Sequence, residues 1–215
     1  MPKAIHVTDW IAFIILIDVA FIALLRHYFP KRFLAFVKVP FNPSYFTEFA
    51  QEKEQPFWFE LILEIVMLLS ISLFIYTLTY FGGSHEINAK DYLVFIKIFL
   101  ASVLFITLQR FFHSLTGQLF NMHKNLTMLI HVKDGYMRWA SLLLILIVLF
   151  TVFASTKTNA LLIIGLVLVV LVYFMGVIRG SSLLAGNKTL NGMHIFFYLC
   201  TLEILPVVAL VKLLT

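Results

Sequence analysis

Six stretches of this chain are apolar over about the length that a helix needs to cross a lipid bilayer. A transmembrane helix takes about 20 mostly apolar residues, and these stretches are 17 to 25 residues long. They predict a multi-pass membrane protein. The stretches are Trp10–Arg26, Phe57–Phe81, Tyr92–Phe112, Met137–Ser155, Asn159–Ile178 and His194–Leu214.

The composition agrees with lipid as part of the solvent. Of the 215 residues, 61% are apolar and 13% are charged, whereas an ordinary soluble domain has about 45–50% apolar and about 25% charged residues. A soluble fold of this size has too small a core to bury that much apolar surface. We therefore exclude a soluble enzyme, a nucleic-acid-binding module and a disordered tail. The expected partner is the lipid bilayer, and no nucleic acid.

The apolar stretches predict helices and not the strands of a barrel. Backbone polar groups inside lipid must bond within the protein, so only helices and closed barrels cross a membrane. Barrel strands would show about 10 residues of alternating polarity, but runs such as Leu161–Phe174 are continuously apolar. The predicted fold is an all-α bundle of about six transmembrane helices. It forms one domain over residues 1–215, with no soluble domain.

Two connections are long enough to hold short helices of their own. Lys31–Lys38 has apolar residues between basic ones, which predicts an interfacial helix on anionic lipid; a plain tether would explain the same residues. Residues 115–132 are half apolar and predict a surface helix or a partly inserted one. His113, His123 and His131 lack the i, i+4 spacing of a helical metal site, so no metal is expected.

The distribution of basic residues predicts the orientation. Eleven of the 16 Lys and Arg lie in or beside the first, third and fifth connections, and four lie in the other connections and at the chain ends. Because cytoplasmic loops are rich in Lys and Arg, both termini are expected in the periplasm of a Gram-negative cell. Trp10, Trp58 and Trp139 each stand at the start of a predicted span, at the headgroup level that such rings favour.

Charge inside a membrane span is expensive, so an ionisable side chain there is a functional candidate by default, and five such side chains are candidates here. Lys97 and Asp18 differ in depth by about 4–5 Å at the rise of an α-helix, so we expect them to pair. Glu60 is expected to reach Arg26 at the inner boundary. The five are Asp18, Glu60, Glu64, Lys97 and Glu203.

Glu64 and Glu203 are then left without an evident cation. A lone carboxyl in lipid favours its neutral form, so each acid is either a neutral group bonded between helices or a working proton or ligand site. Pro206 has no amide hydrogen for the carbonyl of Leu202. A kink beside Glu203 and Thr201 would be similar to the broken helices in which many transporters build their sites.

Other signals are structural. Gly176 and Gly180 lie four residues apart in the fifth span, which permits close helix contact. Cys200 is the single cysteine and is expected to be a small buried apolar side chain. The sequence holds no phosphate-binding loop, no serine-hydrolase elbow and no paired cysteines, so we expect neither an enzymatic activity nor a cofactor.

The last apolar stretch carries a more specific string, Tyr198-Leu-Cys-Thr-Leu-Glu-Ile-Leu-Pro206. It resembles the C-terminal signature Y-L-C-T-L-E-I-L-P of a family of polytopic inner-membrane proteins of Bacteroidota whose function is unknown. The Tyr45-Phe46 pair and Arg179-Gly180 are similar to that family too. The resemblance implies a Gram-negative inner membrane and groups the threonine, the acid and the proline of the string as one motif. It implies no activity.

Two functions of different class stay open. The first is a non-enzymatic component of an envelope assembly for secretion, motility or lipid and glycan export, bound to other membrane-protein subunits. Small size, short loops and the lack of a catalytic motif favour it. The second is a small transporter or flippase, in one form proton-coupled, that uses intramembrane carboxylates. A water-filled cavity at Glu203 would favour the transporter, and a dry bundle with a bare apolar face would favour the assembly.

Overall fold

The computed structural model describes residues 5–41, 45–46, 57–81, 92–119, 123–153 and 159–185. These residues form helices joined by turns, with no strand among them. Five of the helices are long and apolar enough to cross a membrane, which confirms the predicted all-α membrane bundle. The predicted sixth span, His194–Leu214, lies outside the described residues. The helices are α1 (Ile5–Tyr28), α2 (Pro30–Val37), α4 (Phe57–Phe81), α5 (Tyr92–Leu119), α6 (His123–Phe153) and α7 (Asn159–Ala185).

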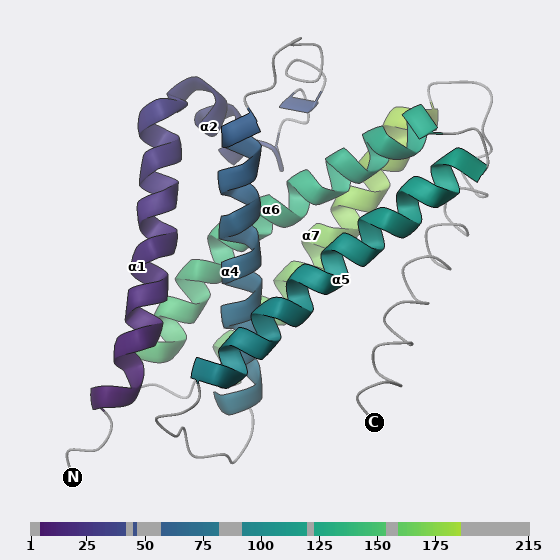
Figure 1. Ribbon diagram of the computed structural model, residues 1–215. Helices are drawn as coiled ribbons and strands as arrows, with labels where there is room; N and C mark the ends of the chain where they lie inside the picture. The colour runs from purple at the N-terminus through teal and green to yellow at the C-terminus, as the bar shows by residue number, and fades with distance from the viewer. Residues whose placement is uncertain are drawn as a thin grey trace.

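The five long helices fall into two groups. Figure 1 shows α1 and α4 standing side by side, whereas α5, α6 and α7 cross them obliquely. α6 contacts each of the other four long helices, most extensively α7, while α4 contacts α1, α5 and α6. The short helix α2 caps the end of the bundle at which α1 ends and α4 begins (Figure 1).

Two helices extend well past the apolar stretches that predict them. α5 continues from Phe112 to Leu119, and α6 begins at His123, 14 residues before the predicted start at Met137. The helix expected over residues 115–132 is not a separate element: residues 115–119 are the end of α5, and residues 123–132 are the start of α6. Polar residues end an apolar stretch, but they do not end a helix unless a cap or a breaker is present.

The predicted short helix in the first connection is present as α2. Pro30 stands at its start, where the missing amide hydrogen costs nothing, and Phe33 and Phe36 are buried. The indole Nε1 of Trp139 on α6 donates a hydrogen bond to the carbonyl of Val37 at 3.0 Å. The apolar face of α2 thus packs on the bundle itself.

Aromatic packing fills the interior at both ends of α4. At the end near α2, the rings of Phe46 and Tyr136 stack with their centres 5.9 Å apart. Gly135 makes room for this, because a Cβ there would lie 2.5 Å from the Phe46 ring. At the other end, Trp10 meets Tyr76 edge-on at 5.0 Å. Helices in lipid are held together mainly by such close packing, since lipid is as apolar as their side chains.

Candidate functional site: a charged cluster between α4, α5 and α6

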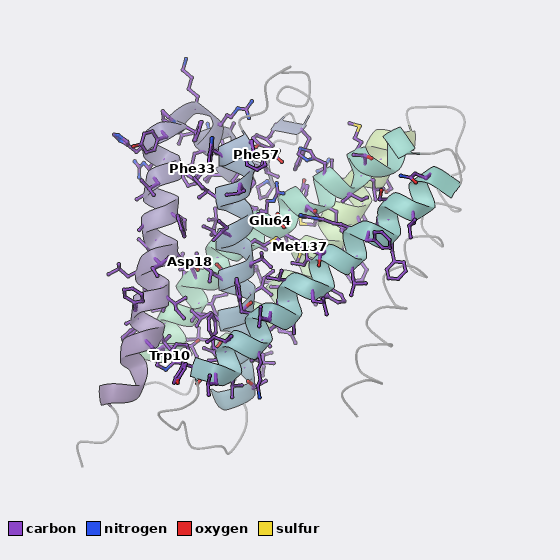
Figure 2. The ribbon with its side chains drawn as sticks, in the orientation of Figure 1. Trp10, Asp18, Phe33, Phe57, Glu64 and Met137 are labelled. Atoms are coloured by element: carbon purple, nitrogen blue, oxygen red, sulfur yellow. The ribbon has the colours of Figure 1, made fainter. Side chains whose placement is uncertain are left out.

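Six ionisable side chains converge where α4, α5 and α6 meet, and we call them the charged cluster. α4 contributes two acids four residues apart, which therefore share one face of the helix. α5 contributes an arginine, and α6 a histidine, an acid and an arginine on one face. Figure 2 places Glu64 on the part of α4 nearer to α2. The members are Glu60, Glu64, Arg110, His131, Asp134 and Arg138.

Glu64 is the centre of the charged cluster. Its Oε1 lies 2.7 Å from Nη2 of Arg110. Its Oε2 accepts hydrogen bonds from Nη2 and Nε of Arg138 at 2.9 and 3.1 Å. Charge-assisted hydrogen bonds of this length are the strong ones. One carboxylate of α4 therefore binds both α5 and α6.

Arg110 connects Glu64 to a second carboxylate. Its Nη2 and Nε donate to Oδ2 of Asp134 at 2.9 and 3.2 Å. Asp134, Arg110, Glu64 and Arg138 thus form a continuous chain of alternating charge across three helices. The sequence leaves Glu64 without a cation, and that expectation is wrong: two guanidinium groups contact it.

Glu60 lies at the edge of the charged cluster. Its Oε2 is 3.9 Å from Nη1 of Arg138, and its Oε1 is 4.0 Å from Nε2 of His131. These separations are too long for hydrogen bonds, and the Glu60 side chain is 31% exposed. The sequence predicts Arg26 as the partner of Glu60. In the structure the Glu60 side chain instead faces α6, on the same side of α4 as Glu64.

The charged cluster is close to electrical balance. It holds three carboxylates and two guanidinium groups, and Lys133, next to Asp134, is buried with its Nζ 5.8 Å from the centre of the Tyr173 ring. Buried charges are tolerated when they are paired and hydrogen-bonded. Among the side chains described, no group of three has the arrangement of a metal site. The arrangement can lock three helices together.

His113 is a further polar group beside this site. It follows Arg110 by one turn of α5 and is 1% exposed. Neither ring nitrogen has a hydrogen-bond partner within the described part of the chain. A buried imidazole without partners is more easily kept in its neutral form, since burial disfavours charge.

Asp18 lies apart from the charged cluster, on α1, where it faces α4. It is fully buried, and its Oδ2 lies 3.1 Å from the hydroxyl of Ser70. That hydroxyl is also 2.6 Å from the carbonyl oxygen of Val66. A serine hydroxyl carries one hydrogen, so both contacts are satisfied when Asp18 is a neutral acid that donates to Ser70, which donates to Val66. No partner for Oδ1 is found among the residues described.

The expected ion pair between Asp18 and Lys97 is absent from the structure. Lys97 lies on the exposed side of α5, whereas Asp18 faces Ser70 of α4. Equal depth is necessary for such a pair, but it does not fix which way each helix turns its side chain. The central position of α4, between α1 and α5, was not readable from depth.

The glycine pair of α7 lies against α6. A Cβ at Gly176 would lie 3.0 Å from Cβ of Tyr136 and 3.4 Å from Cα of Lys133, and one at Gly180 would lie 3.4 Å from Leu129. This is the close helix contact that the spacing of the two glycines predicts. It holds the α6 end of the charged cluster in place.

Three of the site residues predicted from the sequence lie outside the described part of the chain, and three members of the charged cluster were not predicted as site residues. Thr201, Glu203 and Pro206 are outside the described residues. Arg110 and Arg138 enter the prediction only as basic residues beside the third connection, and Asp134 is not predicted as a site residue. The signal that could have found them is the i, i+4 spacing of Asp134 and Arg138, which matches the spacing of the two acids on α4.

Comparison with known proteins identifies a family and no more. A family model described as a domain of unknown function, DUF4271, matches residues 11–214, so the chain belongs to that family. No curated protein matches it significantly. No solved structure does so either.

Proposed function

We propose that this family member is a non-enzymatic integral component of a bacterial cell-envelope assembly, in the inner membrane of a Bacteroidota cell. Secretion, motility, and lipid or glycan export machineries are assemblies of the expected kind. The observation that carries the proposal is the position of α5, which is fixed by charge at one end and bare along its apolar length.

α5 contributes little to the interior of the bundle. Only 6% of its apolar window is buried, compared with 50% of that of α4. Leu100 and Leu104 are 59% and 61% exposed. At the other end, Arg110 binds Glu64 and Asp134 and so sets the rotation of α5 about its axis. A rigidly held helix whose apolar face is left largely exposed by the described part of the chain is suited to bind the helices of another membrane protein.

The charged cluster supports a structural role for its acids. Both oxygens of Glu64 are bound by arginines, and a fully satisfied polar network rigidifies its surroundings. A catalytic or transporting acid would need an unoccupied oxygen for its substrate. The charged cluster therefore fits a scaffold better than a reaction centre.

Site-specific photo-crosslinking tests the assembly. A benzophenone side chain replaces Leu100 or Leu104 on α5, and Phe13 or Leu16 on α1 as matched exposed controls. We expect the α5 positions to trap the same membrane protein, identified by mass spectrometry, while the α1 positions do not. Adducts that are equal on both helices, or that contain lipid alone, would contradict the proposal.

The orientation belongs to the same proposal, with both termini in the periplasm. Alkaline phosphatase fused after Thr215 should be active, because the enzyme folds only outside the cytoplasm. Fusions near Phe46 or Lys124 should be inactive. The reverse pattern would invert the orientation of every helix.

A second candidate function, a small proton-coupled transporter or flippase, is favoured by Asp18. This acid is buried near the middle of a span and has one oxygen without a described partner. Such intramembrane acids can mark proton pathways. Protein reconstituted in vesicles with a pH-sensitive dye should take up protons after an acid pulse if this candidate holds, and Asp18→Asn and Glu203→Gln should abolish uptake while leaving the protein folded. No uptake by the wild-type protein would favour the assembly.

A further inference from the structure

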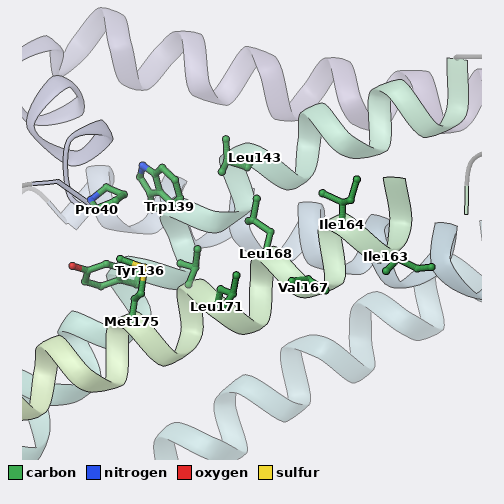
Figure 3. Close-up of a pocket in the computed structure, with 11 residues that line it drawn as sticks. Pro40, Tyr136, Trp139, Leu143, Ile163, Ile164, Val167, Leu168, Leu171 and Met175 are labelled. Atoms are coloured by element: carbon green, nitrogen blue, oxygen red, sulfur yellow. The ribbon is translucent and has the colours of Figure 1, made fainter. Parts of the chain in front are cut away.

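An apolar groove of about 530 Å³ runs along the outer face of the α6–α7 pair (Figure 3). Along α7 it extends from Ile163 to Met175, which is about 18 Å of helix. Tyr136, Trp139 and Leu143 line the α6 side. The α7 residues that line it are largely exposed, so the groove opens towards the space that lipid occupies in a membrane.

One end of the groove is cationic. Arg179 follows Met175 by one turn of α7, so the two share a helix face. Lys38 precedes Pro40, which lines the groove at the end nearer to α2 (Figure 3). Both cations are exposed, and residues 30–41 and 159–185 contain no Asp or Glu. The opposite end near Ile163 carries no charged residue from 159 to 178.

We propose that this groove binds a single anionic phospholipid, with one acyl chain along α7 and its phosphate between Lys38 and Arg179. The groove has two cations at one end and is apolar along the rest of its length. This arrangement matches the anionic headgroup and the apolar acyl chain of such a lipid. The volume of about 530 Å³ falls in the range of about 300–1,000 Å³ that is usual for ligand pockets. Trp139, at the cationic end, belongs to the ring type that favours the headgroup level.

The lining argues against a helix as the occupant. Interfaces between transmembrane helices are enriched in small residues that allow close approach, but the groove is lined by none of Gly, Ala or Ser. The glycines of α7 point elsewhere: Gly165 meets Phe74 of α4, while Gly176 and Gly180 meet α6. A helix 10 Å across and 18 Å long would also fill roughly 1,400 Å³, far more than the groove holds.

Native mass spectrometry of the purified full chain tests the site. Phosphatidylglycerol or phosphatidylcholine with the same acyl chains is added to detergent-solubilised protein, and the bound fraction is titrated. We expect phosphatidylglycerol to bind with the higher affinity. The double variant Lys38→Gln/Arg179→Gln should weaken phosphatidylglycerol binding about 30-fold, since each surface cation contributes roughly fivefold. Lys97→Gln, which removes an exposed cation on α5 that does not line the groove, should not change the affinity for phosphatidylglycerol.

A second pair of variants tests the apolar half. Leu171 is exposed and lines the groove, so Leu171→Trp should fill the groove and abolish tight lipid binding. Leu104→Trp on α5 is the matched control and should not affect binding. Size-exclusion profiles check that both variants remain folded. Equal binding of the two lipids, or equal effects of Leu171→Trp and Leu104→Trp, would overturn the proposal.

Two further outcomes would assign the groove to another occupant and also overturn the proposal. A dimer that Leu171→Trp dissociates would assign it to a second copy of the chain. A disulfide between Cys200 and a cysteine placed by Leu171→Cys, with none for Leu104→Cys, would assign it to the C-terminal segment.

Discussion

The charged cluster and the Asp18–Ser70 contact lie on different faces of α4 and bury carboxyl groups by opposite means. In the charged cluster, each oxygen of Glu64 is bound by an arginine, and a second acid extends the chain of charges. At Asp18 a single hydroxyl is within hydrogen-bond distance, and no cation pairs with the acid among the described residues. The comparison teaches that burial of an acid in this bundle is compensated by arginines at Glu64 and by a hydroxyl at Asp18, so we expect an ionised Glu64 and a neutral Asp18.

The largest effect is expected from Glu64→Gln, which leaves two guanidinium groups without their shared carboxylate. Removing one partner of a buried ion pair costs about 3–5 kcal/mol, and we expect about 2–4 kcal/mol here because Arg110 is 39% exposed. Equilibrium unfolding in detergent measures the loss. The double variant Glu64→Gln/Arg138→Gln should recover part of it. An unchanged unfolding free energy would show that the network contributes nothing to stability.

Ser70→Ala should have the next largest effect, because it removes the hydroxyl that partners Asp18. Leaving a buried polar group without its hydrogen bond costs about 1–3 kcal/mol. Ser102→Ala is the matched control, since the Ser102 hydroxyl bonds within its own helix to the carbonyl of Ile98. Equal unfolding free energies for the two variants would mean that the contact between Asp18 and Ser70 is not stabilising.

Glu60→Gln should cost less than about 1 kcal/mol, the usual value of a partly exposed ion pair. Its neighbours lie at 3.9 and 4.0 Å and donate no hydrogen bond to it. The same unfolding experiment, repeated at high salt, should shrink the small difference further. If Glu60→Gln lowered the free energy of unfolding as much as Glu64→Gln does, Glu60 would be as important to the charged cluster as Glu64.

Asp18→Asn should have the smallest effect, about 0.5 kcal/mol or less. The amide of asparagine can donate to Ser70 just as a neutral acid does, and Ser70 can still donate to Val66. Unfolding of the two proteins side by side is the measurement. If Asn destabilised the protein as strongly as Glu64→Gln does, Asp18 would be ionised and the contrast between the two faces of α4 would fail.

Several features of the site follow from sequence spacing alone. The i, i+4 pair of Glu60 and Glu64 does face one way, and the Gly176–Gly180 pair does mark where α7 approaches α6. These succeed because they depend on the periodicity of one helix. The pairs Lys97–Asp18 and Arg26–Glu60 fail because each joins two helices whose rotation about their own axes was unknown.

The sequence by itself determined that this protein is an all-α membrane bundle, because apolar length and composition decide how a chain meets lipid. The predicted spans also begin at the observed first residues of α4, α5 and α7, which are Phe57, Tyr92 and Asn159. Only the tertiary structure decided the partners of the buried charges. Arg110 and Arg138 lie at the ends of predicted spans and Asp134 lies between them, and the three meet only because α5 and α6 continue as long helices and pack on α4. Ion pairs between helices depend on crossing angles and rotations, and these are set by packing over the whole bundle.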